Sequence, residues 1–121
     1  MATWRKLHQK SIESQDIQDM PDDFTRLLWV MMPLALDKEG RGLDQASWVH
    51  AKFMPLRDDV TSQMVSNAMD WFENRKMIVR YEVDGRRYFY IPTWHTYQKT
   101  DREAASNYPE PCMTNSRVSH T

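Results

Sequence analysis

Apolar residues follow a helical period of about 3.6 over much of the first two thirds of the chain. The first such stretch covers residues 21–37, with Asp22 or Asp23 near its start, where a carboxylate caps a helix well. Pro33 lies inside the stretch and removes one backbone hydrogen bond, so the helix is expected to bend or end just before it. The apolar positions that define this predicted helix are Phe24, Leu27, Leu28, Met31, Leu34 and Leu36.

Two more helices are predicted after a glycine-containing turn at residues 37–44, which leads into a very short extended segment. Asp44 is expected to cap the second helix, which must stop before Pro55 because the residue preceding a proline is disfavoured in helical geometry. Asp58 is expected to cap the third helix, which runs to about Lys76. Apolar side chains fill one half of this third helix and polar side chains the other, so one face is expected in the core.

The hydrophobic pattern then changes from helical spacing to alternation, over residues 77–83 and again over residues 86–91. Asp84 and Gly85 separate the two runs. This dipeptide predicts a two-residue hairpin, because both central residues of a type I′ turn need a positive φ.

The two-residue turn also fixes the expected register of the hairpin. Tyr81 lies opposite Tyr88 on one face, while Glu82 lies opposite Arg87 on the other face, where the two charges can pair. Three helices followed by a two-stranded hairpin is the element order of a winged helix. We therefore predict an α+β fold, a winged helix-turn-helix with three helices and a two-stranded β-hairpin wing.

The chain of 121 residues has room for one domain with a single modest core. We predict an N-terminal arm at residues 1–20, the winged-helix domain at residues 21–103 and a tail at residues 104–121. The tail is polar, contains Pro109 and Pro111, and is expected to be disordered or to serve as a linker.

The formal net charge of −1 gives no basic excess of the kind that marks most nucleic-acid-binding proteins. The charge is unevenly placed, however, with +3 over residues 1–10, −5 over residues 11–23 and +4 over residues 75–102. An anionic partner is therefore expected to meet residues 75–102. The alternative is a solvated basic face that has no partner.

The polar half of the third helix carries Gln63, Ser66 and Asn67, and Asn or Gln can make a paired contact with adenine. Asp70 and Glu73 share this face and would repel phosphate, so contact is expected at the hairpin rather than at the C-terminal half of the helix. Ordinary helix surface is the alternative interpretation of the polar residues.

Arginines at and near the hairpin are the expected phosphate contacts, since each neutralised phosphate adds to a salt-dependent affinity. For Arg87 the alternative is simple pairing with Glu82. The full set of candidate DNA-binding residues is Arg57, Gln63, Ser66, Asn67, Arg80, Arg86, Arg87 and Lys99.

Aromatic residues lie among these cations, a composition that can stack unpaired bases. They are Tyr81, Tyr88, Tyr90, Trp94 and Tyr97. The alternatives are core or dimer contacts and a protein interface, which also favours Tyr, Trp and Arg.

We find no residue pattern that predicts catalysis or a bound metal. The four histidines are scattered, the three glycines form no phosphate loop, and the paired aspartates stand at predicted helix starts, where capping accounts for them. We therefore expect no enzyme, no cofactor and no small-molecule substrate. The single cysteine, Cys112, excludes an internal disulfide, and no apolar run has the length of a signal peptide or a membrane span, so we expect a cytoplasmic protein without a membrane partner.

Several short motifs stand in a characteristic order along nearly the whole chain. They are Ser11, Ser14 and Met20-Pro21, then Leu27-Leu28-Trp29, residues 37–41, residues 83–85 with Tyr88 and Ile91, and residues 94–98 followed by residues 106–109. In order and spacing they resemble the N-terminal winged-helix domain of phage replisome-organiser proteins, which are related to the DnaD-type primosomal proteins. The resemblance implies origin or single-strand DNA binding, self-association and, in longer members, a C-terminal segment that recruits the helicase machinery.

This chain lacks that C-terminal segment, so we interpret it either as part of a longer protein or as a domain with a separate role. The first hypothesis is weakly specific binding of double- or single-stranded DNA by a homodimer in phage or prophage replication initiation, with a host or phage replication protein as a further partner. The second is a protein-binding winged helix that engages or inhibits a host or phage factor. The third is a phage transcriptional repressor.

Overall fold

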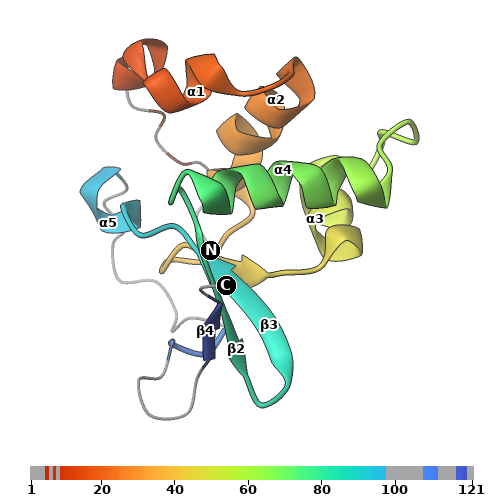
Figure 1. Ribbon diagram of the computed structural model, residues 1–121, viewed down its shortest axis with the longest axis vertical. Coiled ribbons are helices and arrows are strands. Elements are labelled where there is room, and N and C mark those ends of the chain that lie inside the picture. The colour runs from red at the N-terminus through yellow and green to blue at the C-terminus, as the bar shows by residue number, and fades with distance from the viewer. Residues whose placement is uncertain (1–4, 6, 8, 98–107, 112–116, 120–121) are drawn as a thin grey trace.

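The computed structural model describes residues 5, 7, 9–97, 108–111 and 117–119, and it places the helices on one side of an antiparallel sheet (Figure 1). The predicted α+β class is therefore confirmed. The elements in chain order, with η for a 3₁₀ helix, are η1 (Gln9–Glu13), α1 (Gln15–Asp19), α2 (Asp23–Met31), η2 (Met32–Leu34), β1 (Arg41–Leu43), α3 (Ala46–Phe53), α4 (Ser62–Asn74), β2 (Val79–Val83), β3 (Arg86–Tyr90), α5 (Trp94–Tyr97) and β4 (Arg117–Ser119).

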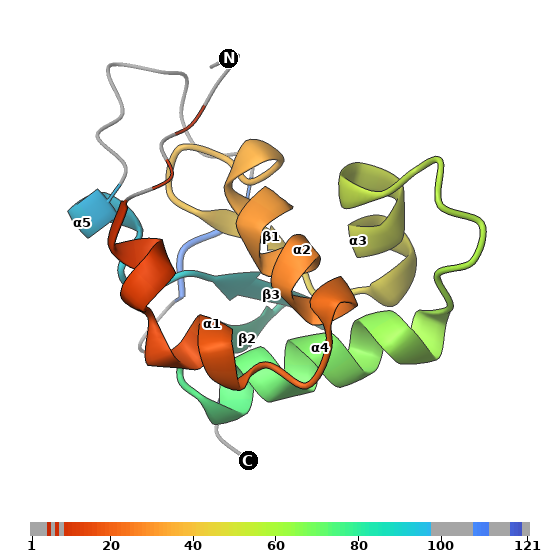
Figure 2. The same ribbon diagram turned by 90° about the horizontal axis from the view of Figure 1, so that it is seen from above.

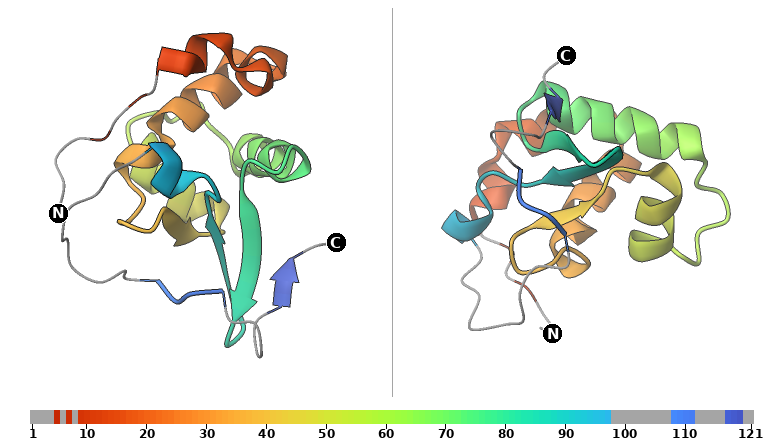
Figure 3. Two further views of the ribbon diagram at one scale, coloured as in Figure 1. Left: turned by 90° about the vertical axis from the view of Figure 1, so that its left-hand side faces the viewer. Right: turned by 90° about the horizontal axis from the view of Figure 1, so that it is seen from below.

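The sheet has the strand order β1-β3-β2-β4, and each neighbouring pair of strands is antiparallel. Helices α2, α3 and α4 cover one face of the sheet (Figure 2). The β2–β3 hairpin extends beyond the helices, so its turn projects away from them (Figure 3). Between the helices and the covered face lies the core, built chiefly from Leu28, Met32, Val49, Phe53, Val65, Ala68, Met69, Phe72, Ile78, Phe89 and Ile91.

Helix α2 confirms the first predicted helix and shows how Pro33 changes it. The carboxylate of Asp22 caps the helix by accepting a 2.8 Å hydrogen bond from the backbone N–H of Thr25. After Met31 the backbone tightens into η2, with Pro33 in its first turn. Proline has no N–H to donate to the preceding helical turn, so the regular α-helix ends here rather than at residue 37.

The caps predicted for the second and third helices are wrong. Helix α3 has Gln45 at its N-cap position with no side-chain cap, because the Asp44 carboxylate instead lies beside Arg80. Helix α4 begins at Ser62, and Thr61 caps it by accepting a 3.1 Å hydrogen bond from the N–H of Met64. Backbone turn bonds occupy the segment just before it, which leaves Asp58 in the loop.

The predicted hairpin and its register are confirmed. Asp84 and Gly85 have φ of +53° and +80°, the signs that a type I′ turn requires. In the register of the two strands, Tyr81 lies opposite Tyr88 and Glu82 lies opposite Arg87. Strand β1 joins the other edge of β3, so the very short extended segment expected near residue 42 is the third strand of the sheet.

Part of the predicted tail packs on the sheet, contrary to expectation. Residues 108–111, which we call the strap, lie on the face of the sheet opposite the helices, beside the hairpin (Figure 3). Strand β4 pairs with β2. The expected boundary at residue 103 therefore excludes segments that contact the domain.

Arg26 is one of the side chains that tie the N-terminal arm to the domain. The guanidinium of Arg26 donates hydrogen bonds of 2.8 to 2.9 Å to the carbonyl oxygens of Ile17, Gln18 and Met20. These carbonyls lie at the C-terminal end of helix α1, where helical partners run out, although Ile17 also accepts from the N–H of Met20; Arg26 therefore satisfies the helix end and joins α1 to α2.

Candidate nucleic-acid interface

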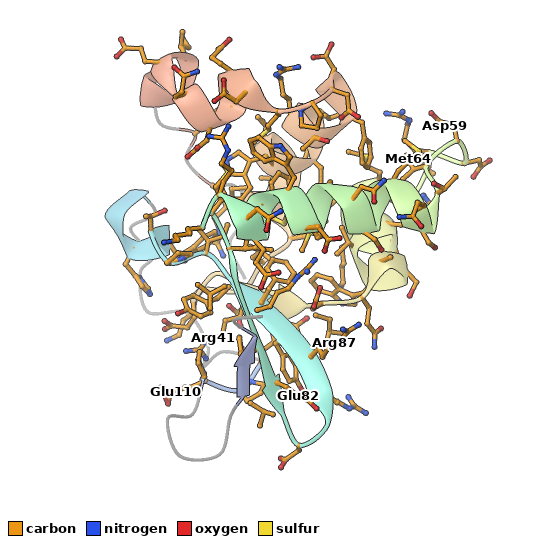
Figure 4. The ribbon with its side chains drawn as sticks, in the orientation of Figure 1. Arg41, Asp59, Met64, Glu82, Arg87 and Glu110 are labelled. Atoms are coloured by element: carbon orange, nitrogen blue, oxygen red, sulfur yellow. The ribbon has the colours of Figure 1, made fainter. Side chains whose placement is uncertain are left out.

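The tip of the β2–β3 hairpin carries two exposed arginines. Arg86 and Arg87 follow the turn directly, and neighbouring residues of a strand point to opposite faces, so one cation stands on each side of the tip. Arg87 lies on the face that carries Arg80 and Phe89, away from Arg41 on the opposite face (Figure 4). The tip therefore presents positive charge on both sides of a narrow, projecting ribbon.

The expected ion pair between the side chains of Glu82 and Arg87 does not form. The two residues are opposite each other in the register, yet no ion pair joins them in the described part of the chain. Within the same described residues, Arg86 has no ion-pair partner either. Both guanidinium groups are thus available to a ligand.

Most of the other arginines already bind groups of the protein itself. Arg75 donates hydrogen bonds of 3.0 and 2.8 Å to Asp16 and Asp19, and its guanidinium lies 4.8 Å from the ring centroid of Trp71. The hydrogen bond from Arg75 lowers the pKa of Asp19. The basic count of residues 75–102 therefore overstates the charge that a partner would meet.

Arg80 is removed from the candidate interface by its surroundings. Its side chain is only 15% exposed, and Nη1 donates to Asp70 at 2.8 Å and to Glu73 at 3.0 Å. Nε lies 3.4 Å from Asp44. Burial disfavours the charged guanidinium, but the hydrogen bond to Asp70 and the three carboxylate charges outweigh it, so the pKa of Arg80 is raised. We correct the prediction: Arg80 joins the sheet to α4 and does not face a ligand.

Burial of the Arg80 cluster also affects the ionisation of Asp44. Burial raises its pKa, although the charge of Arg80 acts in the opposite direction. Arg80 also pairs with Asp70 and Glu73, the acidic residues of α4 that were expected to repel phosphate. A single cation here faces three carboxylates, so this side of α4 keeps a net negative charge, which is unfavourable for close contact with phosphate.

The polar residues of α4 are placed on its solvent side, but two of them bind each other. Gln63 Nε2 donates a 2.8 Å hydrogen bond to Oδ1 of Asn67. Ser66 is half-buried. A base contact by Gln63 or Asn67 would have to replace this bond, which makes α4 a weak candidate for reading sequence.

Arg57 is also engaged. It forms a two-pronged contact with Asp59, with both hydrogen bonds at 2.8 Å. The hydrogen bonds from Arg57 lower the pKa of Asp59 to about 2. The remaining candidate, Lys99, lies outside the described residues.

The aromatic residues that were candidates for base stacking are largely covered. Tyr81 is 1% exposed, Tyr88 is 8% exposed and Trp94 is 2% exposed. The Trp94 N–H donates to the carbonyl oxygen of Lys38. These rings pack within the protein, and sequence reasoning missed what covers the first two, which is the strap.

The described residues contain no group of three or more His, Cys, Asp or Glu side chains that could hold a metal ion. Nor does any described helix combine the length and the apolar character of a membrane span. The chain matches no protein-family model, no curated protein and no solved structure.

Proposed function

We propose that the chain is a winged-helix domain that binds DNA mainly through the phosphate backbone, with the tip of the β2–β3 hairpin as the principal contact. The observation that carries the proposal is the pair Arg86 and Arg87, exposed on a projecting hairpin while most other described arginines are bonded within the protein. A hairpin wing of this kind can follow the backbone or enter a neighbouring minor groove.

The connectivity supports the winged-helix assignment. The chain passes through α2, β1, α3 and α4 before the hairpin, and β1 pairs with β3, the second strand of that hairpin. This arrangement sets α4 and the hairpin next to each other, linked by Arg80. A duplex that meets the hairpin would therefore also pass close to α4.

We expect weak sequence specificity because most polar side chains of α4 are already bonded within the protein. Its polar side chains bind each other and its carboxylates bind Arg80, so few groups remain to read base edges. Phosphate contacts by the hairpin carry no direct sequence information. The motif resemblance supports a role in phage or prophage replication, with a replication protein as a further partner.

Homodimerisation is part of the proposal. Leu27 and Leu34 are 43% and 55% exposed, and both belong to the α2–η2 segment. A second copy would cover this apolar surface. Sedimentation equilibrium over a range of micromolar concentrations tests homodimerisation. A monomer at every concentration in that range would reject it.

DNA binding is tested by fluorescence anisotropy with a labelled duplex of mixed sequence. The variant R86A/R87A is compared with K38Q/K76Q, which removes two positive charges at the opposite end of the sheet. We expect about a tenfold or greater loss of affinity for the first variant only, because each lost contact is a charge-assisted hydrogen bond. Equal affinities for the two variants would reject the hairpin as the contact, and no binding by the wild type would favour a protein partner.

A further inference from the structure

The two faces of the sheet carry different chemistry. The face toward the helices holds core residues such as Ile78 and Phe89. The opposite face holds Tyr81, Tyr88 and Tyr90, which we call the tyrosine face. Tyr81 stacks on Tyr88 with ring centroids 5.5 Å apart, and it meets Tyr90 at 5.9 Å. No helix is needed to bury these rings, because the strap lies on them.

The strap is held through its backbone carbonyl groups. The hydroxyl of Tyr81 donates a 2.6 Å hydrogen bond to the carbonyl oxygen of Pro109. Arg41 Nη1 donates a 3.1 Å hydrogen bond to the carbonyl oxygen of Tyr108. Two consecutive carbonyl groups thus meet two side-chain donors from different strands. A tyrosine hydroxyl is protonated at neutral pH and can donate, and burial raises the pKa of Tyr81 further.

Aromatic rings hold the side chain of the strap. The Tyr108 ring meets Trp48 of α3 nearly at right angles, with centroids 6.0 Å apart, and it lies 6.2 Å from Tyr88. Such edge-on contacts are favourable between aromatic rings. We call the four residues that contact the strap, Trp48, Tyr81, Tyr88 and Arg41, the aromatic groove; they supply three rings and two hydrogen-bond donors.

The sequence of the strap fits this groove for a physical reason. Pro109 and Pro111 have no N–H and a fixed φ, and they bias Tyr108 and Glu110 toward extended geometry. An alternating proline segment therefore loses little conformational entropy on binding and offers carbonyl groups as its backbone contacts. Aromatic grooves bind proline-rich segments in this way.

We infer that the aromatic groove is a binding site for extended peptides of the type Tyr-Pro-x-Pro, closed in this chain by its own strap and open to a matching segment of a partner protein when the strap leaves. The partner class is a peptide rather than a nucleic acid, because both donors of the groove meet backbone carbonyl groups. This site lies on the face opposite Arg87 and does not depend on DNA binding.

Occupancy by the strap is an intramolecular event, which gives it an effective concentration on the order of millimolar. A free peptide must compete with that concentration in the wild-type protein. In the full-length variant Y108S/P109S the groove keeps all its residues, while its internal ligand loses the Tyr108 ring and the Pro109 constraint and is held more weakly. Peptide binding should therefore become visible in the variant.

The probe is the synthetic peptide Ser-Asn-Tyr-Pro-Glu-Pro, titrated into ¹⁵N-labelled protein while the indole N–H resonance of Trp48 is followed by NMR. We expect saturable shifts in Y108S/P109S and at least tenfold weaker binding in the wild type. Adding Y81F to the variant should weaken the peptide several-fold, since the ring stays and one hydrogen bond is lost. The peptide Ser-Asn-Tyr-Ala-Glu-Ala should bind several-fold more weakly than the proline peptide.

Three results would overturn the inference. They are no saturable shift in the folded variant, equal binding of the proline and alanine peptides, and saturable binding at Trp48 by an oligothymidylate where the peptide has none, which would assign the groove to unpaired bases. If Y108S/P109S does not fold, P109A alone serves with the same peptides and outcomes. Duplex affinity of the variant should equal that of the wild type, so a failure here is distinguishable from a failure of the hairpin contact.

Discussion

The indole ring of Trp94 packs so closely against Gly40 that a Cβ on Gly40 would lie 2.7 Å from Cγ of the ring. Gly40 has a φ of +73°, a left-handed conformation that glycine adopts without steric cost. The indole N–H donates a 2.6 Å hydrogen bond to the carbonyl oxygen of Lys38. The turn before β1 and the helix after β3 therefore hold each other in place.

This contact predicts a difference between two glycine substitutions. Gly85 also has a positive φ, but a Cβ there would meet nothing within 4 Å. We expect Gly85→Ala to lower the free energy of unfolding by about 1 kcal/mol, from backbone strain alone. Gly40→Ala should cost at least about 1 kcal/mol more, because the Trp94 ring must move. Urea denaturation measures both, and equal losses would contradict the packing described.

The N-cap of α4 can be tested by substitution of Thr61. Thr61→Ala removes the hydroxyl that accepts from the Met64 N–H and should lower the free energy of unfolding by about 1 kcal/mol. Asp58→Ala is the matched control, because Asp58 lies in the loop, and it should have a smaller effect. A larger loss of unfolding free energy for Asp58→Ala than for Thr61→Ala would show that Asp58 caps the helix, as the sequence predicted.

The cluster around Arg80 predicts a large loss of stability without a loss of DNA contacts. Arg80→Met leaves the carboxylate of Asp44, which is 12% exposed, without its partner. We expect a loss of about 2 kcal/mol in the free energy of unfolding, against less than about 1 kcal/mol for Arg57→Met at an exposed pair. The affinity of folded Arg80→Met for duplex DNA should fall somewhat, because Asp70 and Glu73 lose their cation, but the slope of log K against log salt concentration should equal that of the wild type, because Arg80 contacts no phosphate. A smaller slope for the folded variant would place Arg80 in the interface.

The cap of α2 predicts a pH dependence of stability. Hydrogen bonds from the Thr25 hydroxyl and N–H lower the pKa of Asp22 from its usual value of 3.8. The folded state therefore holds the ionised form more firmly than the unfolded state does, so this stabilisation is present above pH 3.8 and is lost as the pH falls through the lowered pKa.

Asp22→Asn keeps an acceptor oxygen at the cap but does not titrate. Thermal unfolding followed between about pH 2 and pH 6 should show a smaller loss of stability on acidification for Asp22→Asn than for the wild type. Parallel curves for the two proteins would mean that the Asp22 carboxylate does not contribute to acid unfolding.

Local patterns predicted the parts of the fold that neighbouring residues determine. The Asp84-Gly85 turn and the alternation beside it are enough to set the hairpin register, since both depend on backbone geometry within a few residues. Pro33 likewise marks the place where α2 gives way to η2.

The interactions that decide the candidate site join residues far apart in the sequence. Asp44 has a good residue type for a cap, but a cation 36 positions later draws its carboxylate elsewhere. The polar composition of residues 104–121 predicts disorder, yet a tyrosine hydroxyl from β2 binds the carbonyl oxygen of Pro109. Neither partner can be identified from spacing along the chain. The one sequence signal for the strap was the alternation of proline after Tyr108.

The salt dependence of duplex binding tests the hairpin contact most directly. Each phosphate neutralised by a cation contributes about 0.9 to the slope of log K against log salt concentration. We expect R86A/R87A to reduce that slope by roughly 1 to 2, while K38Q/K76Q leaves it near the wild-type value. An unchanged slope for R86A/R87A would show that Arg86 and Arg87 do not meet phosphate, and would contradict the proposed role of the hairpin.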